Sequence, residues 1–109
     1  MKAEVIATLN TLKRLAPGNS VELRIVPFAA ISCIEGVNHR RGTPPNVVEM
    51  SGETWLKLVR NEMQYDTALD GGLIDESGTR AHEVAKHLPF SAKDIRDSLG
   101  DVVWAAVDD

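Results

Sequence analysis

The densest group of chemically active side chains in this 109-residue sequence is the run His39-Arg40-Arg41. Each guanidinium offers a planar fork of hydrogen-bond donors, which suits an anionic head group. Gly42 follows directly and lets the backbone approach a ligand, and Pro44-Pro45 fixes the exit of the loop. The run therefore predicts a polar anchor for a ligand. The alternatives are solvated loop charges, or arginines that brace Glu35 and Glu49.

The other reactive residues do not match a known catalytic or metal-binding pattern. Cys33 is flanked by apolar residues, where a thiol behaves as a small hydrophobe, and as a nucleophile it would need a nearby base. His82 and His87 are five residues apart, whereas two ligands on one helix face are three or four apart. We therefore expect no catalytic residue, no metal and no cofactor. The sequence leaves catalysis open but favours a protein that is not an enzyme.

Charge and cysteine content narrow the classes of partner. The chain has 12 Lys and Arg against 16 Asp and Glu, a net charge of −4, so we expect no nucleic-acid partner. A single cysteine precludes an internal disulfide and fits a reducing compartment. The N-terminal stretch has neither a signal-peptide core nor an apolar span, so we expect a cytoplasmic protein without integral membrane insertion.

The spacing of apolar residues predicts a mixture of helices and strands. An amphipathic helix over residues 2–15 precedes two strands, 21–26 and 29–35, whose short connection favours antiparallel pairing. Further along, the pattern predicts a strand at 47–50, a helix capped by Ser51, a short helix at 65–69 with Asp66 as its cap, a weak edge strand at 73–77, a helix at 81–88 and a short helix capped by Ser91. The final apolar run, 102–107, favours a strand slightly over a helical tail.

Large apolar side chains in these elements are candidates for lining a ligand pocket. Such pockets are mostly apolar, with a few polar anchors. The alternative is a filled core, which apolar stripes at helical spacing usually form. The candidate lining residues are Phe28, Ile31, Trp55, Leu58 and Trp104.

Several short motifs of this chain are found together in one known family. They are Val26-Pro27-Phe28-Ala29-Ala30, Cys33-Ile34-Glu35-Gly36, the run from His39 to Glu49 (HRRGTPPNVVE), Thr54-Trp55-Leu56, Tyr65 with Ala68, Gly72, and Ser77-Gly78. Through these motifs the chain, from about Val21 to Leu88, resembles the sterol carrier protein superfamily, in particular its small actinobacterial branch. Two positions differ from the family pattern: Ser77-Gly78-Thr79 replaces the usual Gly-Asp turn, and Tyr65 stands where branch members often have Trp.

The resemblance implies an α+β fold in a single sterol-carrier-like domain over residues 1–109. We expect a mostly antiparallel sheet of about five strands with helices packed on one face, often with an apolar cavity between the two layers. The core of the resemblance is 21–88, preceded by the N-terminal helix 2–15 and followed by a C-terminal tail, 91–109.

For function, the resemblance implies binding of a hydrophobic or amphipathic, lipid-like small molecule, with Arg40 or Arg41 meeting its polar end. Two alternatives stay open. The chain is also similar to the domain that accompanies a metal-binding helical domain in mycothiol-dependent maleylpyruvate isomerases, which implies an enzyme partner. The third hypothesis is a structural homodimer that uses the tail 91–109, although this tail would equally cover a cavity or complete the core.

Overall fold

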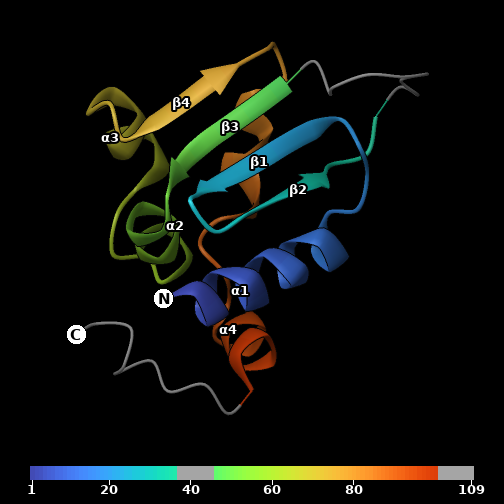
Figure 1. Cartoon of the computed structure of the whole chain (residues 1–109), viewed down its shortest axis with the longest axis vertical. Helices are drawn as coiled ribbons and strands as arrows, with labels where there is room; N and C mark the ends of the chain where they lie inside the picture. Colours follow the sequence, from blue (N-terminus) through green and yellow to red (C-terminus); the bar gives the residue numbers. More distant parts are fainter. Residues whose placement is uncertain (37–45, 101–109) are drawn as a thin grey trace.

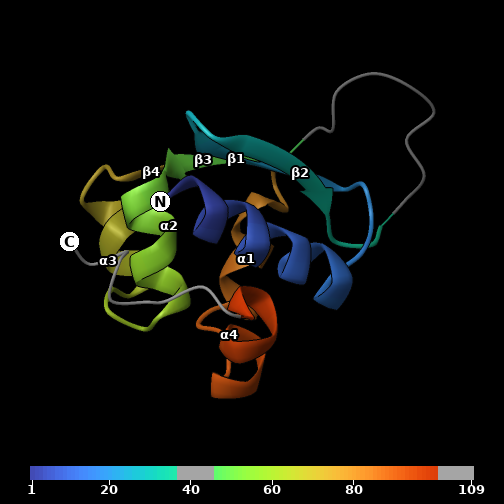
Figure 2. The same cartoon turned by 60° about the horizontal axis from the view of Figure 1, so that its bottom comes forward.

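A four-stranded sheet and the helices that cover one of its faces make up the two layers of the described chain (Figures 1 and 2). The computed structural model describes residues 1–36 and 46–100. The strands are β1 (Val21–Val26), β2 (Ala29–Cys33), β3 (Asn46–Ser51) and β4 (Ile74–Ser77). The helices are α1 (Lys2–Leu15), α2 (Gly52–Val59), α3 (Tyr65–Asp70), the 3-10 helix η1 (Ala81–His87) and α4 (Ala92–Leu99).

This architecture confirms the predicted α+β class, with helices on one face of the sheet. The helix at 2–15 and the first four strands of the prediction are present, with ends that differ by one or two residues. The expected fifth strand, 102–107, lies outside the described residues.

Two of the three strand pairings are antiparallel, and the central one is parallel. The strand order is β2-β1-β3-β4. β1 pairs antiparallel with β2, with Leu23 opposite Ile31, and β3 pairs antiparallel with β4. β1 and β3 run parallel, and Asn46 at the start of β3 lies next to Val21 at the start of β1. The weak strand predicted at the sheet edge is β4, which is an edge strand.

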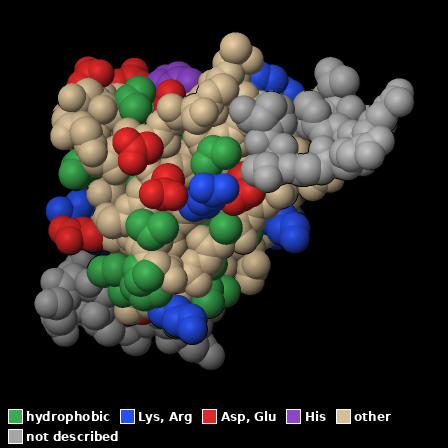
Figure 3. Space-filling view, turned by 45° about the horizontal axis from the view of Figure 1, so that its top comes forward, with side chains coloured by type: hydrophobic (Ala, Val, Ile, Leu, Met, Phe, Trp, Pro, Cys, Tyr) green, Lys and Arg blue, Asp and Glu red, His purple; other side chains and the backbone are tan. Residues whose placement is uncertain are grey.

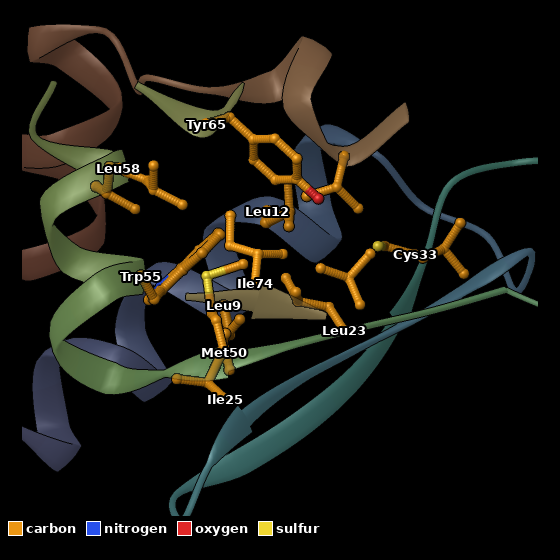
Figure 4. Close-up of a cluster of buried hydrophobic side chains, with 14 of the residues drawn as sticks. Leu9, Leu12, Leu23, Ile25, Cys33, Met50, Trp55, Leu58, Tyr65 and Ile74 are labelled. Carbon is orange, nitrogen blue, oxygen red and sulfur yellow. The ribbon is translucent and has the colours of Figure 1, made fainter. Parts of the chain in front are cut away.

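Alternate positions of the sheet face the helices and form the core. In β1 and β3, every second residue is buried, as expected of strands with one covered face. Figure 4 shows Leu23, Ile25 and Met50 gathered with Leu9 and Leu12 of α1. Removal of this apolar surface from water is the main force that holds the two layers together.

The opposite face of the sheet is polar and carries no helix among the described residues. Arg24 of β1 forms an ion pair with Glu22 and lies 3.9 Å from a carboxylate oxygen of Glu49. Charged side chains are grouped in the middle of this face (Figure 3). These pairs are solvent-exposed, so each contributes little to stability.

The helix ends follow the predicted caps in two of three cases. The Ser51 hydroxyl accepts a hydrogen bond from the Thr54 N–H at 3.1 Å, and the Ser91 hydroxyl accepts one from the Asp94 N–H at 3.0 Å. The prediction that Asp66 caps α3 is wrong, because the cap position is Gln64. No helix in the described part of the chain combines the length and apolar character needed to cross a membrane.

The segment predicted as a helix at 81–88 is a 3-10 helix. Ala81 and Val84 are its buried residues, and their spacing of three matches the three residues per turn of this helix type. The helix contacts β3 and β4 on the covered side of the sheet.

Helix α4, the described part of the predicted tail, packs against α1 of the same chain. The Ser98 hydroxyl donates to the Thr11 hydroxyl at 2.6 Å, and Leu99 is buried. Residues 92–99 therefore pack on the helical layer, whereas the rest of the predicted tail, 101–109, lies outside the described residues, and its role stays a prediction.

A polar junction joins the start of β1, the end of β2 and the start of β3. The Asn46 amide donates to the Ser20 carbonyl at 2.8 Å and accepts from the Arg80 backbone N–H at 2.9 Å. The Arg80 guanidinium donates to the Ser20 hydroxyl, to the Glu35 carbonyl and to Glu83. We call this group the Arg80 junction, and Ser20 and Asn46 are its buried members.

Replacing Asn46→Ala should lower the free energy of unfolding by about 2–3 kcal/mol, because it leaves the Ser20 carbonyl and the Arg80 N–H without their partner. Urea unfolding followed by circular dichroism measures the change. The matched control is Asn10→Ala at an exposed position of α1, where we expect a change within about 0.5 kcal/mol. Equal effects of the two substitutions would contradict a structural role of the junction.

Candidate functional site

Trp55, the central residue of the predicted apolar lining, is fully buried in the core. Its indole N–H donates to the Thr8 hydroxyl of α1 at 2.8 Å. Its ring meets the Phe90 ring edge-on, with centroids 6.1 Å apart. A buried indole requires an acceptor for its N–H, and Thr8 supplies it. These contacts make Trp55 the link between α1, α2 and the segment after η1.

The other predicted lining residues lie in different surroundings. Phe28 and Ile31 are half-buried and pack against the core from the β1–β2 hairpin. Leu58 of α2 is buried and lines a surface pocket. Trp104 and the predicted anchor His39-Arg40-Arg41 lie outside the described residues. Their role in binding stays a prediction.

The pocket that Leu58 lines has a volume of about 210 Å³ and is open on one side. It lies among the C-terminal end of α2, the turn that follows, the start of α3, and η1. Its apolar wall consists of Leu58, Met63, Ala85, Leu88 and Pro89. Its polar residues are Asn61, Gln64, Tyr65, Asp66 and His82. We call it the α2–η1 pocket.

The end of α2 shapes one side of this pocket. Asn61 adopts a left-handed backbone conformation, with φ of 62°, which asparagine tolerates better than most residues. The Glu62 N–H then bonds the Lys57 carbonyl at 2.8 Å, as in the helix termination called the Schellman motif. This turn directs the chain away from α2 toward α3, and the space between the two helices becomes the pocket.

A chain of hydrogen bonds and ion pairs links three polar residues of the pocket, Tyr65, Asp66 and His82, through Glu76 of β4, which is not a lining residue. The Tyr65 hydroxyl donates to Oε2 of Glu76 at 2.5 Å, and Nδ1 of His82 lies 2.9 Å from the same oxygen. Nε2 of His82 lies 3.1 Å from Oδ1 of Asp66. The rings of Tyr65 and His82 meet edge-on, with centroids 5.2 Å apart. Four side chains, Tyr65 and Asp66 of α3, Glu76 of β4 and His82 of η1, are thus tied together.

The environment keeps Tyr65 protonated. Burial raises the pKa of its hydroxyl strongly, and the hydrogen bond to Glu76 and the charge of Asp66 act in the same direction. Tyr65 is therefore a hydrogen-bond donor at physiological pH and not a base. Within residues 1–36 and 46–100, no three His, Cys, Asp or Glu side chains are arranged as ligands of one metal ion.

The sequence analysis did not identify Tyr65, Asp66, Glu76 or His82 as members of one site. One signal was present in the alternation of β4. Ile74 is buried and faces the helices, so Glu76, two residues later, must point the same way. A carboxylate on the covered face of a sheet needs hydrogen-bonding partners, which here come from α3 and η1.

Cys33, which the sequence analysis considered as a nucleophile, is fully buried at the end of β2. Burial raises the pKa of its thiol to about 11, so the reactive thiolate is scarce near neutral pH. Figure 4 places Cys33 within the apolar cluster, beyond Leu23. It behaves as a small core residue.

The described chain is an α+β domain with helices on one face of a four-stranded mixed sheet and a pocket among the helices, an architecture that agrees with a sterol-carrier-like fold. The chain belongs to the bacterial SCP ortholog family, whose model matches residues 1–90, where SCP denotes sterol carrier protein. The match begins at the first residue, so it includes α1, which precedes the resemblance recognised in the sequence. Helix α4 lies beyond it. No curated protein matches the chain significantly.

Stability should fall as the pH rises above about 9. The unfolded thiol of Cys33 ionises near its ordinary pKa, whereas the folded one stays protonated up to about 11, so alkali favours the unfolded state. Between about pH 8 and pH 10.5, wild type should lose about 2 kcal/mol more unfolding free energy than Cys33→Ala. Urea titrations at a series of pH values measure the difference, and identical slopes would contradict it. Tyr65 adds a loss above about pH 10 that both proteins share.

Proposed function

We propose that the protein binds a small amphipathic, lipid-like molecule and holds its apolar part in the α2–η1 pocket. The observation that carries the proposal is the composition of this pocket, an apolar wall beside a compact group of hydrogen-bonding side chains. Small-molecule sites typically combine these two features. Membership of the bacterial SCP ortholog family supports the same class of ligand.

The size of the pocket limits what enters it. At about 210 Å³ it is smaller than the roughly 300–1,000 Å³ of sites that enclose a whole drug-sized ligand. One short hydrocarbon segment fits against Leu58, Met63 and Leu88, and the rest of the molecule extends through the open side. The ligand is therefore held by one end.

The predicted anchor at His39-Arg40-Arg41 is outside the described residues, so the proposal rests on the α2–η1 pocket alone. An enzyme partner of the mycothiol-dependent type and a homodimer stay predictions from the sequence.

Binding of straight-chain alcohols tests the proposal. Each added methylene that enters the pocket contributes about 0.8 kcal/mol, so affinity should rise roughly fourfold per carbon and level off once the pocket is filled. Isothermal titration calorimetry from butanol upward measures this series, and the methyl signals of Leu58 and Leu88 in NMR spectra report the location.

A variant whose pocket is filled by a larger side chain tests where the alcohols bind. Ala85→Leu places extra side-chain volume in the pocket and should weaken binding at least tenfold, whereas Ala3→Leu, at an exposed position of α1, should leave it unchanged. Thermal unfolding checks that both variants fold. Failure of every alcohol to bind, or equal affinity in the Ala85→Leu variant and wild type, would refute the proposal.

A further inference from the structure

We infer that the α2–η1 pocket selects ligands whose polar end donates hydrogen bonds and carries no negative charge, such as an alcohol or an amine, and discriminates against carboxylates. This inference rests on the proposed function and adds the chemistry of the polar end. It follows from the charges around the pocket.

The acidic group at the pocket rim is Asp66, whose side chain is 77% exposed. The Nε2 atom of His82 lies 3.1 Å from Oδ1 of Asp66. A carboxylate accepts about four hydrogen bonds, so Asp66 has capacity for a ligand hydroxyl or ammonium group. Glu76, which is 18% exposed, stands behind it and adds a second negative charge.

Positive charge at the pocket is already engaged. Among residues 1–36 and 46–100, the lining of the α2–η1 pocket includes no Lys or Arg. His82 is the lining group that can become cationic, and both of its ring nitrogens face carboxylates, of Glu76 and Asp66. Among the described residues, a ligand carboxylate at the rim would therefore meet the charge of Asp66, with that of Glu76 behind it, and no Lys or Arg of the pocket lining would compensate it.

The cations nearest in sequence, Arg60 and Lys86, are not lining residues of the pocket. Arg60, at the end of α2, forms an ion pair with Glu62 at 2.8 Å. On η1, Lys86 and Glu83 line a separate hollow on the surface, which shares His82 and Ala85 with the α2–η1 pocket. Neither cation lines the pocket.

The neutral side chains at the rim of the pocket are also able to bind a ligand group that donates hydrogen bonds. The side-chain N–H of Gln64 donates a hydrogen bond to the side-chain oxygen of Asn61 at 3.0 Å. The side-chain oxygen of Gln64 is then able to accept a hydrogen bond from a ligand. Neutral amide donors alone compensate a carboxylate less well than a guanidinium or ammonium does. The rim as a whole favours hydroxyl and ammonium groups.

Three probes with the same alkyl chain test the inference at neutral pH: decanol below its solubility limit, and decylamine and decanoate below their critical micelle concentrations. Calorimetry on the full chain should show decanol and decylamine binding at least tenfold more tightly than decanoate. Equal or tighter binding of decanoate would overturn the selectivity while leaving the proposed function intact. Binding of none of the three would overturn the proposed function itself, and the inference with it.

Substitution of Asp66 tests whether its charge is the source of the preference for decylamine over decanoate. Asp66→Asn removes the rim charge and should reduce the ratio of decylamine to decanoate affinity at least threefold. The control is Asp70→Asn at the other end of α3, which makes the same change in net charge outside the pocket. It should leave the ratio unchanged at moderate salt, where distant surface charges are screened. An equal reduction in both variants would overturn the assignment to Asp66.

Discussion

The Arg80 junction is the interaction on which the remaining structure depends. β1 and β3 run parallel although β2 lies between them in sequence, so the chain must return to the start of β1 before β3 begins. Asn46, Ser20 and Arg80 bond these strand starts directly. Gly36 belongs to the same junction, because a Cβ atom there would lie 2.0 Å from the Arg80 guanidinium and 2.1 Å from the Ser20 hydroxyl. Since Arg80 directly precedes η1, the junction also positions one wall of the pocket.

Glu76 connects this framework to the candidate site. Its carboxylate points toward the helices, where an unpaired charge would be costly. Tyr65 and His82 compensate it, so the start of α3 and the middle of η1 are both drawn to the edge strand β4. The pocket is the space left between these segments and the end of α2. This inward carboxylate thus helps to position the segments around the site, while Asp66 supplies the charge at its rim.

Sequence signals that act within a few residues predicted most helices and strands. Features that depend on contacts between residues far apart in the sequence were missed. Ser51 and Ser91 act within a few residues, so the helix starts that they cap were identified correctly. The parallel pairing of β1 with β3 depends on Asn46 and Arg80, which are 34 residues apart. The 3-10 geometry of η1 was missed because Ala81, Val84, Ala85 and Leu88 fit an α-helix equally well by spacing. The pocket was missed because its polar side combines residues from three elements that only tertiary packing brings together.

Ile34 helps to protect one edge of the sheet against pairing with strands of other chains. Its backbone is left-handed, with φ of 69°, which is unusual for a β-branched residue and ends β2 there. Its N–H and carbonyl bond Ala16 and Ser20, so the end of α1 is tied to this edge, and α1 runs alongside β2 (Figure 1). At the opposite edge, β4 is four residues long and acidic. Short, charged or covered edges resist the strand addition that leads to aggregation, and both edges of the described sheet have at least one of these features.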